Sequence, residues 1–329
     1  MSSLTIIREY LTRYGMSIYL ILGNIGNIFN IIIFCQARHR RNSCSRYLLM
    51  ASIMNIFIIN FGVIPTIYSL NHIDPETYSI VYCKLRIYIL HSALMISRSM
   101  IVLACIDRFA VSSSSKRLHV FGQPRVAIRL IMFVSCLWPI IALHILILFT
   151  IKLRRCTAYG KYSLVYSIYS CIVAGSLPPT LMIIFGGLTI RNLHDIHSRV
   201  RPNTIRMDRI QRKDHYLSVM LICEVIVYFI STIPYPIHTL YLTITRDMIK
   251  SPSRLQIESF ITFLTYSFLI YVNSASTFYI YIGTSRAFRR QCQQYLIRCW
   301  RKITVRSNVQ RVASEYRRAF SPPLQTTCV

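Results

Sequence analysis

Seven long apolar stretches limit what this chain of 329 residues can fold into. Five of them contain no Asp, Glu, Lys or Arg, and the other two contain two ionisable side chains each. A bilayer core requires about 20 apolar residues per crossing helix. Backbone groups in lipid must also find partners within the protein, which makes each stretch a predicted transmembrane helix. The predicted spans are 14–37, 47–73, 87–106, 130–151, 162–190, 216–245 and 259–285.

The composition favours a membrane protein over a soluble one. Hydrophobic residues make up 53% of the chain and charged residues only 15%, whereas soluble domains contain about 25% charged residues. The formal net charge of +27 would by itself also suit nucleic-acid binding. The apolar content instead favours basic loops beside an anionic inner leaflet, so we expect no nucleic-acid partner. The expected fold is an all-α membrane protein, a seven-helix bundle.

The distribution of Lys and Arg predicts the orientation in the membrane. Segments 38–46, 109–129, 191–215 and 286–329 carry most of the basic residues between the spans. The positive-inside rule places these segments in the cytoplasm and the N-terminus outside. We expect a multi-pass plasma-membrane protein with a short extracellular N-terminus at 1–15, a membrane domain at 16–299 and a cytoplasmic tail at 300–329.

Short motifs follow one another along the apolar stretches. The first stretch contains GNIGN, and the second contains YLLMASIMN. The third begins at Cys83 and ends in Asp107-Arg108-Phe109. The later motifs are WP at 138–139, PP at 178–179, IPY at 233–235, NSASTFYIY at 273–281 and RAFRR at 286–290.

This ordered set resembles the rhodopsin-like (class A) G-protein-coupled receptors over residues 16 to about 298. The pattern is most similar to that of the neuropeptide and FMRFamide-type invertebrate receptors. The resemblance implies a receptor, not an enzyme, that passes the signal of an extracellular ligand, here expected to be a neuropeptide, to a heterotrimeric G protein. It also implies arrestin as a partner, an amphipathic helix 8 after the seventh span, and no cofactor.

Several positions depart from the family pattern and leave alternatives open. Asn55 stands where the family has Asp, and Thr232 stands where it usually has tryptophan. Thr277 and Phe278 replace the Asn-Pro pair of the seventh helix, although Tyr281 is retained. An atypical or ligand-independent relative of the receptors is therefore one alternative. A polytopic transporter or channel is another, although the paired halves typical of transporters are not visible.

The resemblance pairs Cys83 with Cys156. These are the only two of the eleven cysteines that the predicted topology places outside the cell. Disulfides persist in that oxidising environment but not in the cytosol. We therefore predict a bond that ties the start of the third span to the second outer loop.

The resemblance also assigns residues to a conformational switch. Arg108 is expected to pair with Asp107, and with Asp214 at the base of the sixth helix in the resting state. Pro234 is expected to let that helix bend, because proline removes a backbone hydrogen bond. Tyr281 is the retained switch residue of the seventh helix.

Polar residues within the spans predict a polar core. Asn27 is expected to be the anchor of the first helix. Five further residues map onto the family's sodium site, but Asn55 lacks the carboxylate that usually anchors such a cation. We expect weak sodium sensitivity, a polar cluster and no metal site. The five residues are Asn55, Ser97, Asn273, Ser274 and Thr277.

Two charged residues lie in the middle of predicted spans. Ionisable groups at this depth are costly and commonly functional. Arg98 lies in the third span and Glu224 in the sixth, and these helices are neighbours in the family's fold. The hypothesis is an ion pair that forms in one conformational state, with separate contacts to water as the alternative.

The ligand class is narrowed by two absences. The seventh span has Tyr271 where a retinal-binding lysine would stand, and the third has Leu90 where amine receptors have aspartate. The expected outer cavity is polar, aromatic and partly basic, which suits a peptide. Its expected lining is Arg86, His91, Tyr235, His238, Tyr241, Glu258 and Tyr266.

Two features are predicted after the last span. Cys292 and Cys299 lie in a basic amphipathic stretch, which is typical of palmitoylation sites. The final residues TTCV fit a terminal ligand for a PDZ domain, which binds the carboxylate and adds the peptide as a strand.

Overall fold

The computed structural model describes residues 3–113, 115, 117–152, 154–199, 205–246, 248–298, 300–301 and 304, without the side chains of 38 and 193–218. The chain forms two compact units, Met1–Arg286 and Ala287–Val329, which we describe separately.

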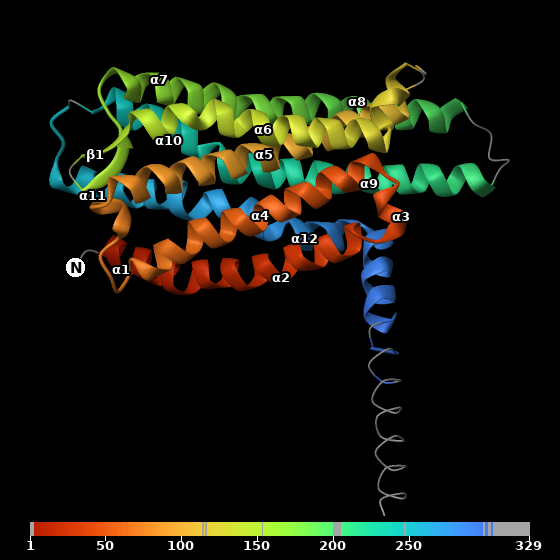
Figure 1. Ribbon diagram of the computed structural model, residues 1–329, viewed down its shortest axis with the longest axis horizontal. Helices are drawn as coiled ribbons and strands as arrows, with labels where there is room; N and C mark the ends of the chain where they lie inside the picture. The colour runs from red at the N-terminus through yellow and green to blue at the C-terminus, as the bar shows by residue number, and fades with distance from the viewer. Residues whose placement is uncertain are drawn as a thin grey trace, which may run out of the picture. The chain divides into compact units, whose positions relative to one another are not determined.

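The first unit is a bundle of helices that lie side by side (Figure 1). Its α-helices are α1 (Ser3–Tyr10), α2 (Met16–Phe34), α3 (Ala37–Arg40), α4 (Ser43–Tyr68), α5 (Ile80–Ser112), α6 (Pro124–Leu148), α7 (Lys161–Tyr169), α8 (Leu177–Arg199), α9 (Ile205–Thr232), α10 (Pro234–Ile244), α11 (Pro252–Thr262) and α12 (Val272–Thr284). Three π-helical segments continue these helices at Leu11–Gly15, Ser170–Ser176 and Phe263–Phe268. Short 3₁₀ segments lie at Pro75–Thr77, Leu118–Gly122 and Leu269–Tyr271.

Within the described residues, seven helical spans are long and apolar enough to cross a membrane. Large apolar side chains such as Ile21, Phe133 and Ile147 are exposed on the bundle, as lipid contact requires. The prediction of an all-α, seven-helix membrane bundle is confirmed. The spans are Ser3–Phe34, Ser43–Tyr68, Ile80–Ser112, Pro124–Leu148, Lys161–Asn192, Val219–Ile244 and Pro252–Thr284.

The first span begins earlier than hydropathy predicts. Residues 3–15, which we expected to form a separate N-terminus, are helical and continue into α2. An ion pair between Arg13 and Glu9, four residues apart and 3.0 Å between charged atoms, supports this helical segment. The Arg8 guanidinium lies 5.4 Å from the centre of the Phe263 ring. These polar residues lower the mean hydropathy without preventing helix formation.

A β-hairpin after α6 was not predicted. Strand β1 (Phe149–Lys152) pairs antiparallel with β2 (Arg155–Ala158), and Ile151 is opposite Cys156. Arg154 adopts a φ of 56° at the turn, a left-handed conformation that tight hairpin turns require. The hairpin is only four residues per strand, too short for a clear alternation of polar and apolar residues.

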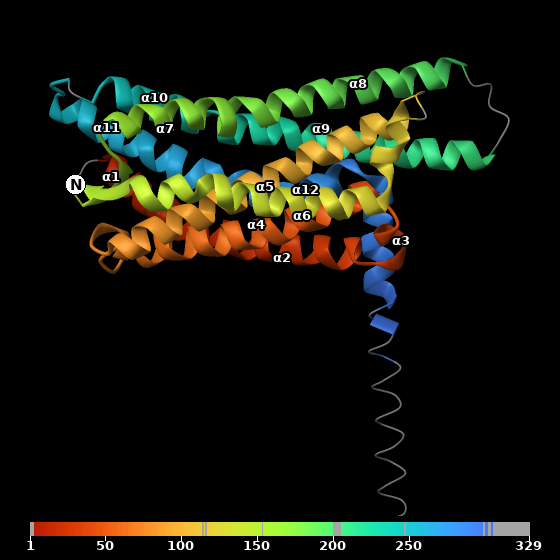
Figure 2. The same cartoon turned by 45° about the horizontal axis from the view of Figure 1, so that its top comes forward.

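Helices pack most closely where small residues meet bulky ones. Helix α4 packs against α2 and α5, and α8 lies beside α9 in both views (Figures 1 and 2). A Cβ atom added to Gly62 of α4 would lie 2.3 Å from the Tyr271 ring. Small residues of this kind allow close helix approach in membranes, where lipid offers no hydrophobic drive for association.

The second unit begins with helical backbone, which extends over residues 287–298. Its amphipathic character as helix 8, and the modification of Cys292, remain predictions. Cys299 and residues 326–329, where the second palmitoylation site and the PDZ ligand were predicted, lie outside the described residues.

We predict that Gly62→Ala destabilises the bundle by up to about 2 kcal/mol. Moving the Tyr271 ring costs about 1–3 kcal/mol, and the helix propensity of alanine offsets about 1 kcal/mol of that cost. Thermal unfolding of the purified chain in detergent measures the effect. Gly283→Ala is the matched control, since no described atom beyond its chain neighbours and its own helix backbone lies within 4 Å of its added Cβ, and it should be neutral or stabilising. Equal melting temperatures for both variants would contradict the prediction.

Candidate functional site

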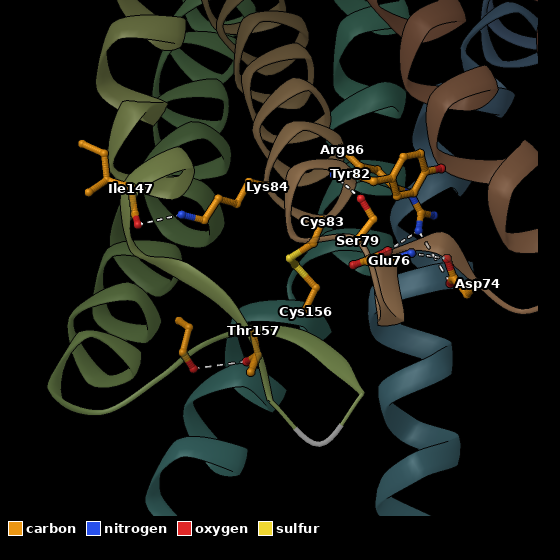
Figure 3. Close-up of a disulfide and its surroundings, with 11 residues drawn as sticks. Asp74, Glu76, Ser79, Tyr82, Cys83, Lys84, Arg86, Ile147, Cys156 and Thr157 are labelled. Carbon is orange, nitrogen blue, oxygen red and sulfur yellow. Dashed lines mark hydrogen bonds and ion pairs between the residues drawn. A yellow bond between two sulfur atoms is a disulfide. The ribbon is translucent and has the colours of Figure 1, made fainter.

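A disulfide marks one end of the bundle. Cys83, in the first turn of α5, is bonded to Cys156 of β2, and their Cα atoms are 5.7 Å apart. Figure 3 shows the bond beside the loop before α5. The predicted pairing is confirmed. We call this end of the bundle the disulfide end, and the opposite end, where α5 finishes, the Arg108 end.

A cavity of about 470 Å³ opens among the helices at the disulfide end. Residues of α4, α5, α10 and β2 contribute to its wall, together with the segment Leu269–Tyr271. On α5 its lining extends from Arg86 to Arg98, which is about 18 Å along a helix axis. This volume is in the range of small-molecule and cofactor sites.

A charged group lies at the mouth of the cavity, close to the disulfide (Figure 3). The Arg86 guanidinium forms an ion pair with Glu76 and lies 4.0 Å from a carboxylate oxygen of Asp74. Its Nη2 also donates to the Gly62 carbonyl and the Thr66 hydroxyl, both at 3.2 Å. Burial raises the pKa of Glu76, and the Arg86 charge opposes that rise. Arg86 therefore links α5 to α4 and to the loop between them.

Aromatic and hydroxyl groups line the middle of the cavity. The Tyr166 and Tyr235 hydroxyls are 3.1 Å apart, and the Tyr266 hydroxyl is 2.5 Å from that of Thr239. His91 Nε2 lies 2.9 Å from the Tyr169 hydroxyl. Four of the predicted lining residues are therefore in the cavity wall, namely Arg86, His91, Tyr235 and Tyr266.

The other three predicted lining residues, His238, Tyr241 and Glu258, are not part of this cavity wall. Glu258 of α11 accepts hydrogen bonds from Tyr241, at 2.7 Å, and from Lys250 and Arg254. His238 is 2.9 Å from the Thr262 hydroxyl. Their polar groups instead contact one another or neighbouring residues of α10, α11 and the loop between them, and their role in ligand binding stays a prediction.

Arg98 and Glu224 do not form the predicted ion pair in this structure. The Arg98 guanidinium lies over the Tyr228 ring, 5.2 Å from its centre. Tyr228 is one helical turn beyond Glu224 along α9, so the carboxylate lies closer to the Arg108 end than the guanidinium does. Arg98 Nη1 instead donates to the carbonyl of Ala174, at 3.2 Å.

A pair of prolines explains why the Ala174 carbonyl is available. In an α-helix this carbonyl would accept from residue 178, and in a π-helix from residue 179. Both are proline and have no N–H group. The Arg98 guanidinium and the Tyr228 hydroxyl, at 3.0 Å, occupy the freed carbonyl. The proline pair was visible in the sequence, but the side chains that donate to the freed carbonyl could not be identified from it.

Glu224 has a different partner, on the seventh span. Its Oε2 accepts a hydrogen bond of 2.7 Å from the Tyr281 hydroxyl. Its Oε1 is buried without a hydrogen-bond partner among the described residues. The predicted switch residue Tyr281 is thus bonded to an acidic residue of α9 that sequence reasoning had paired elsewhere.

The Arg108 end contains the other predicted switch residues. Arg108 Nε donates to Asp107 Oδ2 at 3.0 Å, and both side chains are buried. Helix α9 ends at Thr232 and α10 begins at Pro234, so the span is interrupted where a bend was predicted. The side chain of Asp214 is outside the described residues, and the predicted contact with Arg108 remains a prediction.

The predicted polar core residues lie together between four helices. Asn27 Nδ2 donates to the Ser274 carbonyl at 2.9 Å. Asn55 accepts from the Ser97 hydroxyl at 2.8 Å and donates to Thr277 at 3.4 Å. Asn273 contributes only its backbone carbonyl, which accepts from the Thr277 hydroxyl at 2.9 Å, while its side-chain Oδ1 has no hydrogen-bond partner among the described residues. The cluster joins α2, α4, α5 and α12.

The chain belongs to the 7 transmembrane receptor (rhodopsin family), whose family model matches residues 26–281. Members of this family are receptors rather than enzymes, and the chain is a multi-pass membrane protein. A comparison with curated proteins finds no match.

We predict that Glu76→Ala destabilises the chain by about 3 kcal/mol, because the Arg86 charge would remain largely buried without its closest partner. Glu9→Ala is the control, since it removes an exposed pair that contributes at most about 1 kcal/mol. Melting temperatures of the two variants in detergent provide the comparison. An equally small effect of both would show that the Arg86 group contributes little.

Proposed function

We propose that this chain is a plasma-membrane receptor that responds to an extracellular peptide by promoting nucleotide exchange on a heterotrimeric G protein. The observation that carries the proposal is the position of two sites on one helix. Helix α5 lines the cavity at the disulfide end and carries the buried Asp107–Arg108 pair at the other end. A ligand with unequal affinity for two arrangements of the bundle would shift the population at both ends.

The charge distribution supports an orientation with the disulfide end outside. Most loop Lys and Arg residues belong to segments at the Arg108 end, as the positive-inside rule requires for cytoplasmic loops. Those segments would face the anionic inner leaflet, the G protein and arrestin. The tail from residue 300 would be cytoplasmic, with its terminal residues available to a PDZ domain.

The cavity lining supports a peptide rather than a monoamine or retinal. Tyrosine hydroxyls, His91 and the Arg86 group offer several donors and acceptors along the wall, as a peptide backbone requires. Leu90, also in the wall, provides no carboxylate for an amine. The motif similarity to neuropeptide and FMRFamide-type receptors agrees with this class.

The bond between Tyr281 and Glu224 supports a retuned switch in place of the family's Asn-Pro pair. It joins α12 to α9, the helix that would move on activation. The neutral polar core around Asn55 agrees with weak sodium sensitivity, because a neutral amide attracts a hard cation less than a carboxylate does.

The first test is G-protein activation in cells that express the chain, challenged with pooled peptides and with pooled small molecules. We expect a peptide response that Arg108→Ala abolishes and that Arg13→Ala, an exposed arginine of the first span, retains. High basal signal lost in Arg108→Ala would indicate a ligand-independent receptor. Silence of wild-type protein at the cell surface would contradict G-protein coupling.

A second test addresses the switch. We expect Tyr281→Phe to raise basal signalling about tenfold, because a hydrogen bond to an ionisable group contributes about 1.5 kcal/mol. The double variant with Glu224→Leu should show no further rise, since both changes remove the same bond. Tyr279→Phe is the control, since among the described residues the Tyr279 hydroxyl donates to the Leu22 carbonyl alone. Additive effects, or unchanged basal signal, would refute the role of this bond.

A further inference from the structure

Arg98 places a positive charge in the cavity wall without a carboxylate partner. The residue is 6% exposed and lines the cavity. Among the described residues, Nη1 has two acceptors, the Ala174 carbonyl and the Met95 sulfur at 3.9 Å. A guanidinium carries five N–H donors, and no described carboxylate oxygen lies within 4.0 Å of it. Its remaining donors have no protein acceptor in the described part of the chain.

The cavity wall contains three other arginines, Arg8, Arg86 and Arg246, and among the described residues only Arg86 has a carboxylate partner. Arg8 is exposed, and its guanidinium lies beside the Phe263 ring. Arg86 is paired with Glu76 and lies near Asp74, the two acidic residues of the cavity wall. Arg246 is near the surface, and its guanidinium lies 4.1 Å from the centre of the Tyr159 ring. Both acidic residues lie beside Arg86, which is about 18 Å along α5 from Arg98. The inner part of the cavity is therefore electropositive.

Arg98 is also held in a fixed position. The carbonyl freed by the proline pair anchors Nη1, and the same carbonyl accepts from the Tyr228 hydroxyl while the Tyr228 ring lies against the guanidinium. A charge this deep in a membrane protein is costly and is normally paired or placed on a functional path. A preorganised guanidinium with free donors facing a cavity is suited to a carboxylate, which it can bind through two parallel hydrogen bonds.

We propose that the cavity takes a ligand with a carboxylate group, which reaches the inner end and binds Arg98. The tyrosines and His91 contact the rest of the ligand, and the Arg86 group lies at the entrance. This inference rests on the proposed receptor function and narrows its ligand to acidic molecules. The acid group is either the free C-terminus of a short peptide or that of a small organic acid, and an amidated C-terminus would lack the negative charge that pairs with Arg98.

The test measures melting temperatures of the full chain in nanodiscs with matched acids and amides. One pair is 3-phenylpropionate and 3-phenylpropionamide. The other is a pool of N-acetylated tetrapeptides ending in an aromatic residue, prepared with free or amidated C-termini. We expect the acid of at least one pair to raise the melting temperature and its amide to have no effect. Whether the small acid or the peptide acid acts distinguishes the two sources of the carboxylate.

Substitutions at position 98 assign the effect to the guanidinium. Arg98→Gln should weaken acid binding at least about tenfold, whereas Arg98→Lys should retain part of it. Arg125→Gln, at an exposed position, should bind as the wild type does. Without any probe, Arg98→Gln should melt at the wild-type temperature or above it, because it removes a buried charge that lacks a carboxylate partner. Marked destabilisation by Arg98→Gln and Arg98→Lys alike would instead assign the residue to structure alone and overturn the proposal.

Three further results would overturn the proposal: equal shifts by acids and amides, an acid shift that survives Arg98→Gln, or no shift by any acid at millimolar concentration. The assay contains no G protein, so its outcome is separate from that of the receptor function. Acid binding without signalling would contradict the receptor function only. Signalling by an amidated peptide alone would contradict the carboxylate only.

Discussion

The bundle depends on polar groups that find their partners inside the protein, because hydrocarbon offers them no water. The cluster around Asn55 meets this requirement by bonding to Ser97 of α5 and Thr277 of α12, while Asn27 of α2 binds the backbone of α12. The two bonds to α12 link helices that are distant in sequence. The same contacts that satisfy these amides therefore fix how four of the spans pack.

A local irregularity extends this principle toward the cavity. Two consecutive prolines leave the Ala174 carbonyl without a backbone donor, and residues of two other spans, Arg98 and Tyr228, take the vacant place. The three spans meet at one acceptor, next to the inner end of the cavity. A ligand that binds Arg98 would thus act on a group that already contacts α9, the helix expected to move in a receptor of this family.

Several residues typical of the family are missing from the spans. At these positions, other side chains of the bundle form hydrogen bonds between the helices. The tyrosine of the last span is bonded to Glu224 although the Asn-Pro pair before it is absent. Asn55 lacks a charge but still binds α5 and α12 through its amide. Interhelical contacts in the polar core are therefore retained, with different donors and acceptors.

The sequence by itself determined the seven spans, because apolar length is a property of each segment alone. The family resemblance, together with the predicted outer position of Cys83 and Cys156, sufficed for the disulfide. The tertiary structure decided which side chains face one another. Arg98 meets Tyr228 and not Glu224, and Glu258 binds Lys250 and Arg254 outside the cavity, because the rotation and depth of each helix depend on the packing of all the others. A shift of a helix by one turn, about 5.4 Å along its axis, leaves the hydropathy of the span almost unchanged. It nevertheless changes which side chain of that helix faces a given residue.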